Sequence, residues 1–245
     1  TGNYNVLRVG QPINALYGYQ FVGVNSANGN PVYRKADGTL LMGNITNSSY
    51  FSIADLNSTT IGRAGSLASS DRQILGSALP TYFGGITNTI RVKQFMVDML
   101  FRFSGGNKIM NITRQESLLN QGFMNNGVEI LKRWQKPGDV TTVPRLWYNR
   151  DNFTNLNQQA STRFIEKGDF FRMDNLSVNY DVPAALLGRL FKNSVKSFRF
   201  LLQAQNLFVI TDYTGIDPDN IDERGLDYNT LPPARTISFG VNIGF

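Results

Sequence analysis

Acidic residues are concentrated near the end of the sequence, and their carboxylates could bind a cation. Six of them fall between positions 208 and 234: Asp212, Asp217, Asp219, Asp222, Glu223 and Asp227. The segment Asp217-Pro218-Asp219 is similar to the start of a calcium loop, in which alternate residues supply oxygen ligands. The match then fails, because Ile221 stands at the fifth position and Asp222 replaces the glycine of the sixth. The regular calcium motif is therefore excluded, and an irregular calcium site remains open.

The 245 residues contain neither cysteine nor histidine, which removes most catalytic chemistry. Disulfides, thiolate nucleophiles and most zinc sites need cysteine. The Ser-His and Asp-His arrangements of hydrolases need histidine, including those of barrel-borne lipases and proteases. We therefore expect that the protein is not an enzyme, and we assign it no catalytic residue, metal ligand or cofactor.

The charge balance is basic. The 24 Lys+Arg against 18 Asp+Glu give a net charge of +6 and a pI near 9.6. Nucleic-acid binding also needs a recognisable binding motif, and none accompanies the densest basic cluster, residues 132–136. We interpret this cluster as a solvated surface and expect no nucleic-acid partner.

Strict alternation of residue types is the strongest structural signal. In residues 235–245, Ile237, Phe239 and Val241 alternate with small or polar residues, which places the two sets on opposite faces of a β-strand. The same alternation predicts five strands, at 82–92, 95–104, 171–182, 197–207 and 235–245. One apolar and one polar face are typical of an outer-membrane β-barrel, apolar toward lipid and polar toward the lumen. The predicted fold is all-β, as part of a large antiparallel transmembrane barrel.

The alternation also assigns a direction to each side chain. Side chains predicted to face lipid include Phe101, Val178, Phe200 and Phe239. The candidates for lining the lumen are Arg91, Asp98, Arg102, Asn175, Arg199, Gln203 and Gln205. A register slip of one residue would turn every one of these polar side chains toward lipid.

The connections between the strands differ in length. Residues 105–169 and 208–234 are predicted to be long extracellular loops, whereas Lys93-Gln94 and residues 183–196 form the periplasmic connections. Loop aromatic residues are candidates for contacts with a capping partner, although each could instead pack its own loop. These candidates are Trp134, Trp147, Tyr148 and Tyr213.

Two helices are expected within these connections. Spacing predicts a short helix within residues 114–134. After Pro183, an apolar stripe predicts a second helix, which either packs on the protein or rests at the membrane boundary. The stripe consists of Leu186, Leu187, Leu190 and Phe191.

Residues 1–81 are polar and are predicted to be mainly an extracellular loop region. A strand is expected near 16–24, with a turn at residues 28–31. Residues 43–73 show little periodicity and are expected to be mostly loop without a core.

Several features indicate a mature form or a fragment. The sequence has no starting Met and no signal peptide. No apolar run approaches the roughly 20 residues of a membrane-spanning helix. Five strands cannot close a barrel without leaving unpaired edges in lipid. We expect the remaining strands and any domain that fills the lumen to lie outside this sequence.

Short motifs along the chain resemble one family as an ensemble. They include Val9-Gly10-Gln11-Pro12-Ile13, Arg133-Trp134 with Lys136-Pro137-Gly138-Asp139, Arg163-Phe164-Ile165-Glu166, Gln205-Asn206-Leu207-Phe208 and Asp217-Pro218. In this order they are similar to the C-terminal quarter of the SusC/RagA-type TonB-dependent transporters of Bacteroidetes outer membranes. Phe245 also matches, and the resemblance implies that it is a signal for barrel assembly.

The resemblance implies a barrel of about 22 strands with a plug domain in its lumen. Its implied partners are a SusD-like surface lipoprotein, the TonB complex acting through the missing N-terminal part, the rest of the barrel and plug, and outer-membrane lipid. The expected function is nutrient uptake, as import of oligosaccharides or peptides. Two alternatives remain open: a structural or interaction subunit of a secretion or surface assembly without transport, and a soluble β-sandwich binding module.

Overall fold

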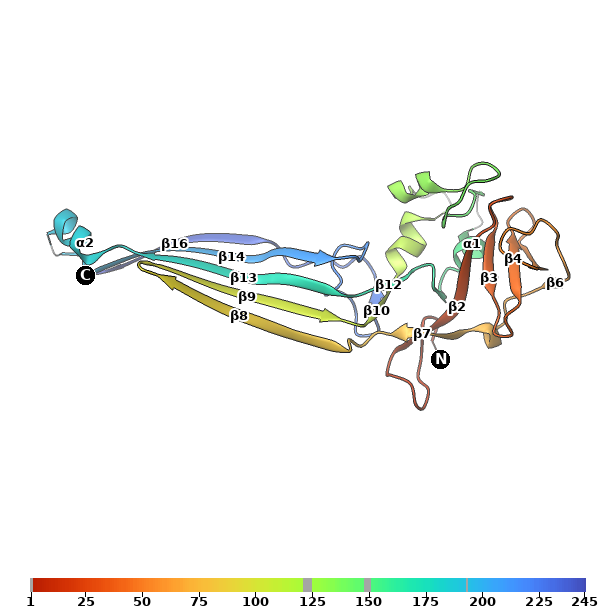
Figure 1. The fold of residues 1–245 in the computed structure, drawn as a ribbon, viewed down its shortest axis with the longest axis horizontal. Helices are drawn as coiled ribbons and strands as arrows, with labels where there is room; N and C mark the ends of the chain where they lie inside the picture. Colours follow the sequence, from red (N-terminus) through yellow and green to blue (C-terminus); the bar gives the residue numbers. More distant parts are fainter. Residues whose placement is uncertain (1, 121–124, 148–150, 193) are drawn as a thin grey trace.

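The computed structural model describes residues 2–120, 125–147, 151–192 and 194–245. The molecule is elongated, with a long sheet at one end and a compact region at the other (Figure 1). The C-terminus lies at the far end of the long sheet, beside α2 (Ala184–Phe191), and the N-terminus lies in the compact region.

The long sheet contains the five predicted strands. They are β8 (Tyr82–Val92), β9 (Phe95–Gly105), β13 (Phe170–Asp181), β14 (Ser197–Thr211) and β16 (Thr236–Gly244). Their order is β16-β14-β13-β9-β8, and every neighbouring pair is antiparallel. Within the described residues, the outer strands β8 and β16 do not pair with each other, so this sheet is open. The main difference from the prediction is that β14 continues to Thr211.

A β-bulge interrupts the pairing of β13 at Asp174. Met173 pairs with Phe101 of β9, and Asn175 pairs with the adjacent residue, Leu100. Asp174 is therefore an extra residue with no pairing partner in β9. The bulge also involves β14, where Asn206 has a φ of 51°, a left-handed conformation in which asparagine is enriched. Bulges change the direction of side chains. Here the bulge brings the Asp174 carboxylate within 2.8 Å of Arg102 Nε.

β2 (Ala15–Val24) is the central strand of the compact region, which confirms the strand expected near 16–24. The other strands of its sheet are β1 (Asn5–Val6), β3 (Pro31–Arg34), β4 (Leu40–Asn44), β5 (Ser49–Ile53), β6 (Ala64–Gly65), β7 (Gln73–Ser77) and β11 (Ala160–Ser161). Gly18 of β2 allows a close approach, because a side chain there would meet the backbone of Ala160. This lets β11 pair in parallel with β2.

Residues 43–73 lie largely in loops, as predicted, but the expectation that they hold no core is wrong. β4 and β5 pair over five residues each. Met42 and Ile53 are buried with Val32 in one apolar cluster, and Ile45 is fully buried. These strands are short, and their burial does not alternate: the middle of β4 is buried on both faces, and β5 is partly buried along most of its length. They therefore lack the alternation that identifies a half-buried strand.

The remaining elements are short. A three-stranded sheet is formed by β10 (Lys108–Asn111), β12 (Ile165–Lys167) and β15 (Leu226–Asp227). The other helical elements are the 3₁₀-turns Ser69–Asp71 and Val128–Lys132, a π-helical turn Arg114–Leu118 and α1 (Asp151–Asn155). The helix predicted within 114–134 is therefore two separate irregular turns, whereas α2 follows Pro183 as predicted.

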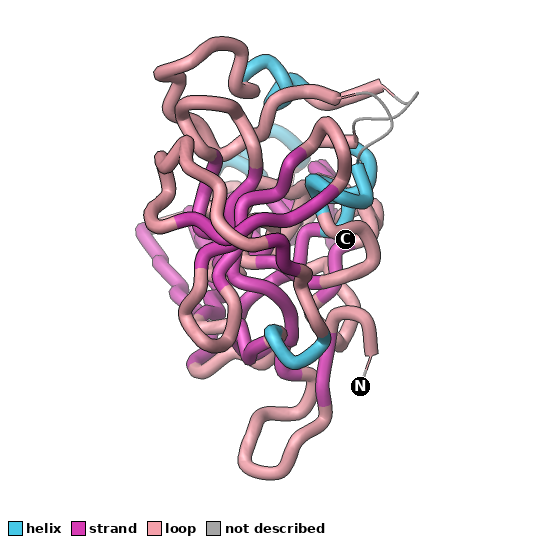
Figure 2. Tube along the Cα trace, turned by 90° about the vertical axis from the view of Figure 1, so that its right-hand side faces the viewer, coloured by secondary structure: helices cyan, strands magenta, loops and turns pink. Residues whose placement is uncertain are grey.

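The compact region is assembled from segments that are distant in the sequence. Its main apolar cluster brings together Leu16, Met110, Phe164 and Leu226. β10 also pairs with β15, which joins residues 105–169 to residues 208–234. Figure 2 views the molecule from this end and shows the loops surrounding the strands. The two long connections thus lie at the same end of the long sheet, as predicted.

Candidate functional site

The two faces of the long sheet carry different side chains. Directly paired residues of antiparallel strands lie on the same face. One row across the sheet is Ile90, Val97, Val178, Leu202 and Phe239. The adjacent row, on the opposite face, is Thr89, Asp98, Ser177, Gln203 and Ser238. We refer to these as the apolar face and the polar face.

The register places every lumen candidate on the polar face. These residues are Arg91, Asp98, Arg102, Asn175, Arg199, Gln203 and Gln205. Phe101, Val178, Phe200 and Phe239 all lie on the apolar face. The predicted division of side chains into two sets is therefore observed. That the polar face lines a lumen stays a prediction.

Aromatic residues collect toward both ends of the apolar face. Near the long loops, Phe101 and Phe171 stack with ring centroids 5.4 Å apart. Near α2, Phe95 and Tyr180 lie 4.7 Å apart. The rows between are mostly aliphatic. Aromatic girdles that flank an apolar band are typical of transmembrane barrels.

The length of the strands fits such a band. β8 and β9 each contain 11 residues. At roughly 3.3 Å per residue such a strand is about 36 Å long. A tilt of about 45° would reduce its height to roughly 25 Å, the height of the apolar band in outer-membrane barrels.

Polar side chains on the polar face contact near neighbours. Thr89 Oγ1 donates to Asp98 Oδ1 at 2.7 Å. Arg199 and Asp181 form an ion pair at 2.6 Å, with side chains about half exposed. Pairs this exposed contribute little stability, because water and salt screen them. These groups are therefore accessible to solvent at the polar face.

A cluster of five charged residues joins the polar face to residues 208–234. Arg102 of β9 bonds Asp174 through Nε at 2.8 Å and Asp219 through Nη2 at 2.7 Å. Arg172 of β13 bonds Asp217 at 2.5 Å, and both side chains are almost fully buried. Charge-assisted bonds of this kind are the stronger ones. We call this group the five-charge cluster, and it holds the loop against the sheet.

The ion pairs of Asp217 and Asp219 affect whether residues 208–234 could bind calcium. The carboxylates of Asp217 and Asp219, its two principal candidates, are both paired with arginine. In the part of the chain that the structure describes, no group of three or more acidic residues is arranged to hold a metal ion.

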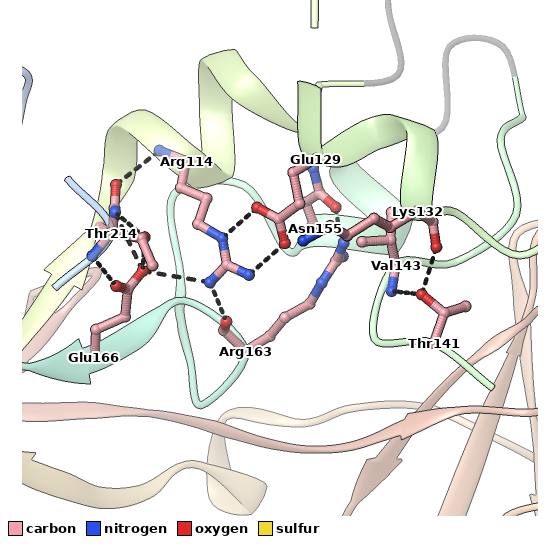
Figure 3. A network of polar contacts seen from close by, with 10 residues as sticks. Arg114, Glu129, Lys132, Thr141, Val143, Asn155, Arg163, Glu166 and Thr214 are labelled. Atoms are coloured by element: carbon pink, nitrogen blue, oxygen red, sulfur yellow. Dashed lines mark hydrogen bonds and ion pairs between the residues drawn. The ribbon is translucent and has the colours of Figure 1, made fainter. Parts of the chain in front are cut away.

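A second polar network joins the two long connections at the compact end (Figure 3). Arg114 bonds Glu129 at 2.6 Å and Glu166 at 3.3 Å. Glu166 in turn accepts from the backbone N–H of Thr214 at 2.9 Å. The hydrogen bond from Arg114 lowers the pKa of the Glu129 carboxyl, and the pKa of Arg114 is correspondingly raised.

Arg163 is a buried cation within this network. Its Nη1 donates to Asn155 Oδ1 at 2.8 Å, and its guanidinium lies 4.8 Å from the ring centroid of Phe164. Burial lowers the pKa of Arg163 to about 10, so the group remains charged at neutral pH. The sequence alone could not identify Arg163 as a buried cation, because the fold brings its partner Asn155 to it.

The aromatic candidates for partner contact have different environments. The Trp134 indole N–H donates to the backbone oxygen of Ser26 at 2.8 Å, and the Tyr213 hydroxyl donates to Asp227. Burial raises the pKa of Tyr213. Tyr213 thus packs within its own loop, whereas Trp134 packs against residues 26–29 of the N-terminal region. Trp147 is 40% exposed, and Tyr148 lies outside the described residues.

None of the helices in the described residues is long and apolar enough to cross a bilayer.

Comparison with known proteins gives consistent results. No family model matches the sequence. The chain is 30% identical to TonB-dependent receptor P3 of Formosa agariphila over 250 residues, which covers 98% of this chain and 23% of that protein. It is 22% identical to TonB-dependent receptor SusC of Bacteroides thetaiotaomicron, over 74% of this chain and 17% of that protein.

Solved structures show the same fold. A structure of the RagAB peptide transporter matches with a TM-score of 0.71 and 20% identity, over 99% of this chain and 25% of that chain. The RagAB peptide importer in its open-open state matches with a TM-score of 0.68 and 20% identity, over 94% and 22% of the two chains. This chain spans about a quarter or less of the length of all these relatives. By sequence and by fold, it belongs to the SusC/RagA-type TonB-dependent receptors and corresponds to part of their barrel.

Proposed function

We propose that this chain forms part of the wall of an outer-membrane importer. Residues 82–245 would supply five barrel strands, with 105–169 and 208–234 as extracellular loops and residues 1–81 as a further extracellular region. The observation that carries the proposal is the register of the long sheet, which separates a banded apolar face from a charged and amide-rich face. A sheet with lipid on one side and water on the other is expected to have one apolar face and one polar face.

The substrate class that fits the polar face is an oligosaccharide or a peptide. Asn175, Gln203 and Gln205 supply amides, and Arg91 and Asp98 supply charges. Amides bond equally well to sugar hydroxyls and to peptide groups, because they both donate and accept. The similar solved structures are of RagAB, which is named as a peptide importer or transporter, and this supports the peptide part of the class.

The partners that fit the proposal are a SusD-like lipoprotein over the compact region and the TonB complex acting through parts of the receptor outside this sequence. Support for the first comes from the exposed ring of Trp147 and from the rigid packing of the two long connections against each other. A preorganised surface binds with a smaller entropy cost than a mobile one.

Uptake by cells tests this proposal. A strain that lacks the full-length receptor should lose growth on a defined oligosaccharide pool or peptide pool, and the wild-type gene should restore it. A receptor whose TonB-binding segment is deleted should reach the surface but fail to restore growth. Unchanged uptake of every pool, together with loss of a surface or secreted assembly, would instead establish the structural role.

A further inference from the structure

α2 lies at the end of the long sheet, in the connection between β13 and β14 (Figure 1). Leu187 is only 3% exposed, so this side chain attaches the helix to the strands. Leu186 and Leu190 are 43% and 64% exposed, although they belong to the same apolar stripe. A helix that merely packed on the protein would bury this stripe and expose its polar side.

The exposed leucines border an apolar groove. It has a volume of about 290 Å³ and lies between α2 and the ends of β13 and β14. Its strand side is formed by Tyr180, Phe198 and Phe200, which lie on the apolar face. The groove is therefore continuous with the surface that we place against lipid.

Three cationic residues lie at the end of α2 and directly after it. Arg189 lies in the last turn of α2, and Lys192 is its C-cap. Lys196 directly precedes β14, and its Nζ donates to the backbone oxygen of Phe245 at 3.3 Å. The sequence contains no acidic residue between Asp181 and Asp212. The nearer of these, Asp181, belongs to the polar face and is paired with Arg199 at 2.6 Å. The cations thus have no acidic neighbour in this stretch of sequence.

We propose that α2 and the adjoining strand ends bind a phospholipid of the neighbouring bilayer leaflet. An acyl chain lies in the groove, and the anionic headgroup lies at Lys192 and Lys196. Continuity with the apolar face favours a lipid over a soluble peptide, and the local excess of cations favours an anionic headgroup. This inference rests on the proposed placement of the sheet in the outer membrane.

Spin labelling tests the groove in the full-length receptor, reconstituted in nanodiscs of phosphatidylethanolamine and phosphatidylglycerol. Any native cysteines are replaced, and a nitroxide is attached to Leu190→Cys or, as the control, to Ala185→Cys. These positions lie about 140° apart around the helix. The label at 190 should collide with oxygen, and the label at 185 with a water-soluble nickel reagent. Equal exposure of both labels to the nickel reagent overturns the acyl-chain site.

Lipid analysis of the same receptor tests the charges. The phosphatidylglycerol enrichment of retained lipid should fall by roughly fivefold per lysine removed in Lys192→Gln and Lys196→Gln. Lys167→Gln, an exposed lysine at the far end of the sheet, should keep the wild-type enrichment. A double variant that keeps it as well overturns the headgroup site.

Uptake measured on the same variants separates this inference from the proposed function. A receptor that imports substrate without lipid preference refutes only the lipid site. A receptor that retains lipid but imports nothing refutes only the importer role.

Discussion

Arg102 and Arg172 lie directly opposite each other on β9 and β13, on the same face of the sheet. Like charges in this position repel, so the pair depends on carboxylates around it. Asp174 comes from the bulge in β13, and Asp217 and Asp219 come from the loop. The carboxylates of residues 208–234 therefore stabilise the two arginines, and the arginines in turn hold this loop against the sheet.

Asp217→Asn should release the loop from the sheet. The substitution leaves the buried Arg172 without its closest carboxylate, and loss of one partner of a buried pair costs roughly 3–5 kcal/mol. Limited proteolysis of the full-length receptor should then cut within residues 208–234 much faster. The exposed residue Asp212 supplies the control, since Asp212→Asn should leave the cleavage rate unchanged. Equal rates for both variants would refute a role for the five-charge cluster.

The polar network around Arg114, within residues 105–169, should weaken in acid. Arg114 holds the pKa of Glu129 below its usual 4.5. A carboxyl whose pKa is depressed by folding contributes stability above its unfolded pKa, and loses it as the pH falls through the folded value. Hydrogen exchange of residues 108–118, corrected for its intrinsic pH dependence, should therefore accelerate below about pH 4.5. In Glu129→Gln, exchange should be faster at neutral pH and should show less of this acid effect.

The two faces of β14 should respond differently to the same new charge. Phe200 lies on the apolar face, and Gln203 lies on the polar face. Arginine on the lipid face costs about 2–4 kcal/mol at mid-membrane and less toward the membrane boundary, where Phe200 lies, whereas lumen positions tolerate it. Phe200→Arg should reduce the amount of folded receptor in outer-membrane fractions well below that of Gln203→Arg. Similar amounts of the two variants would mean that the faces have been assigned incorrectly.

Sequence patterns could predict the long sheet because each of its strands is half-buried. Alternation with a period of two identifies such strands, and the pattern around Val178 and Phe239 is unbroken. The same rule could not detect β4 and β5, which are only five residues long and whose burial does not alternate. It also gave no sign of the bulge at Asp174, because an extra residue alters pairing without altering composition.

The side-chain contacts of the candidate site were harder to predict from the sequence than the apolar and polar faces of the long sheet. The pair Arg172–Asp217 is separated by 45 residues, and nothing in the local sequence links the two. Trp134 looked suited to a partner contact because it is an aromatic residue in a polar segment. The fold instead uses its indole to bond Ser26 across 108 residues. Roles defined by distant contacts need the tertiary structure.

The outer edges of β8 and β16 should pair with strands that are not among the described residues. β16 pairs with β14 on one side only, and unpaired N–H and C=O groups in hydrocarbon cost several kcal/mol each. In an antiparallel pair, one neighbour satisfies only alternate amides. Hydrogen exchange of the full-length receptor should therefore show slow exchange for every amide from Ile237 to Ile243. Fast exchange at every second position would mean that β16 remains an open edge, and the barrel assignment of this sheet would then have to be abandoned.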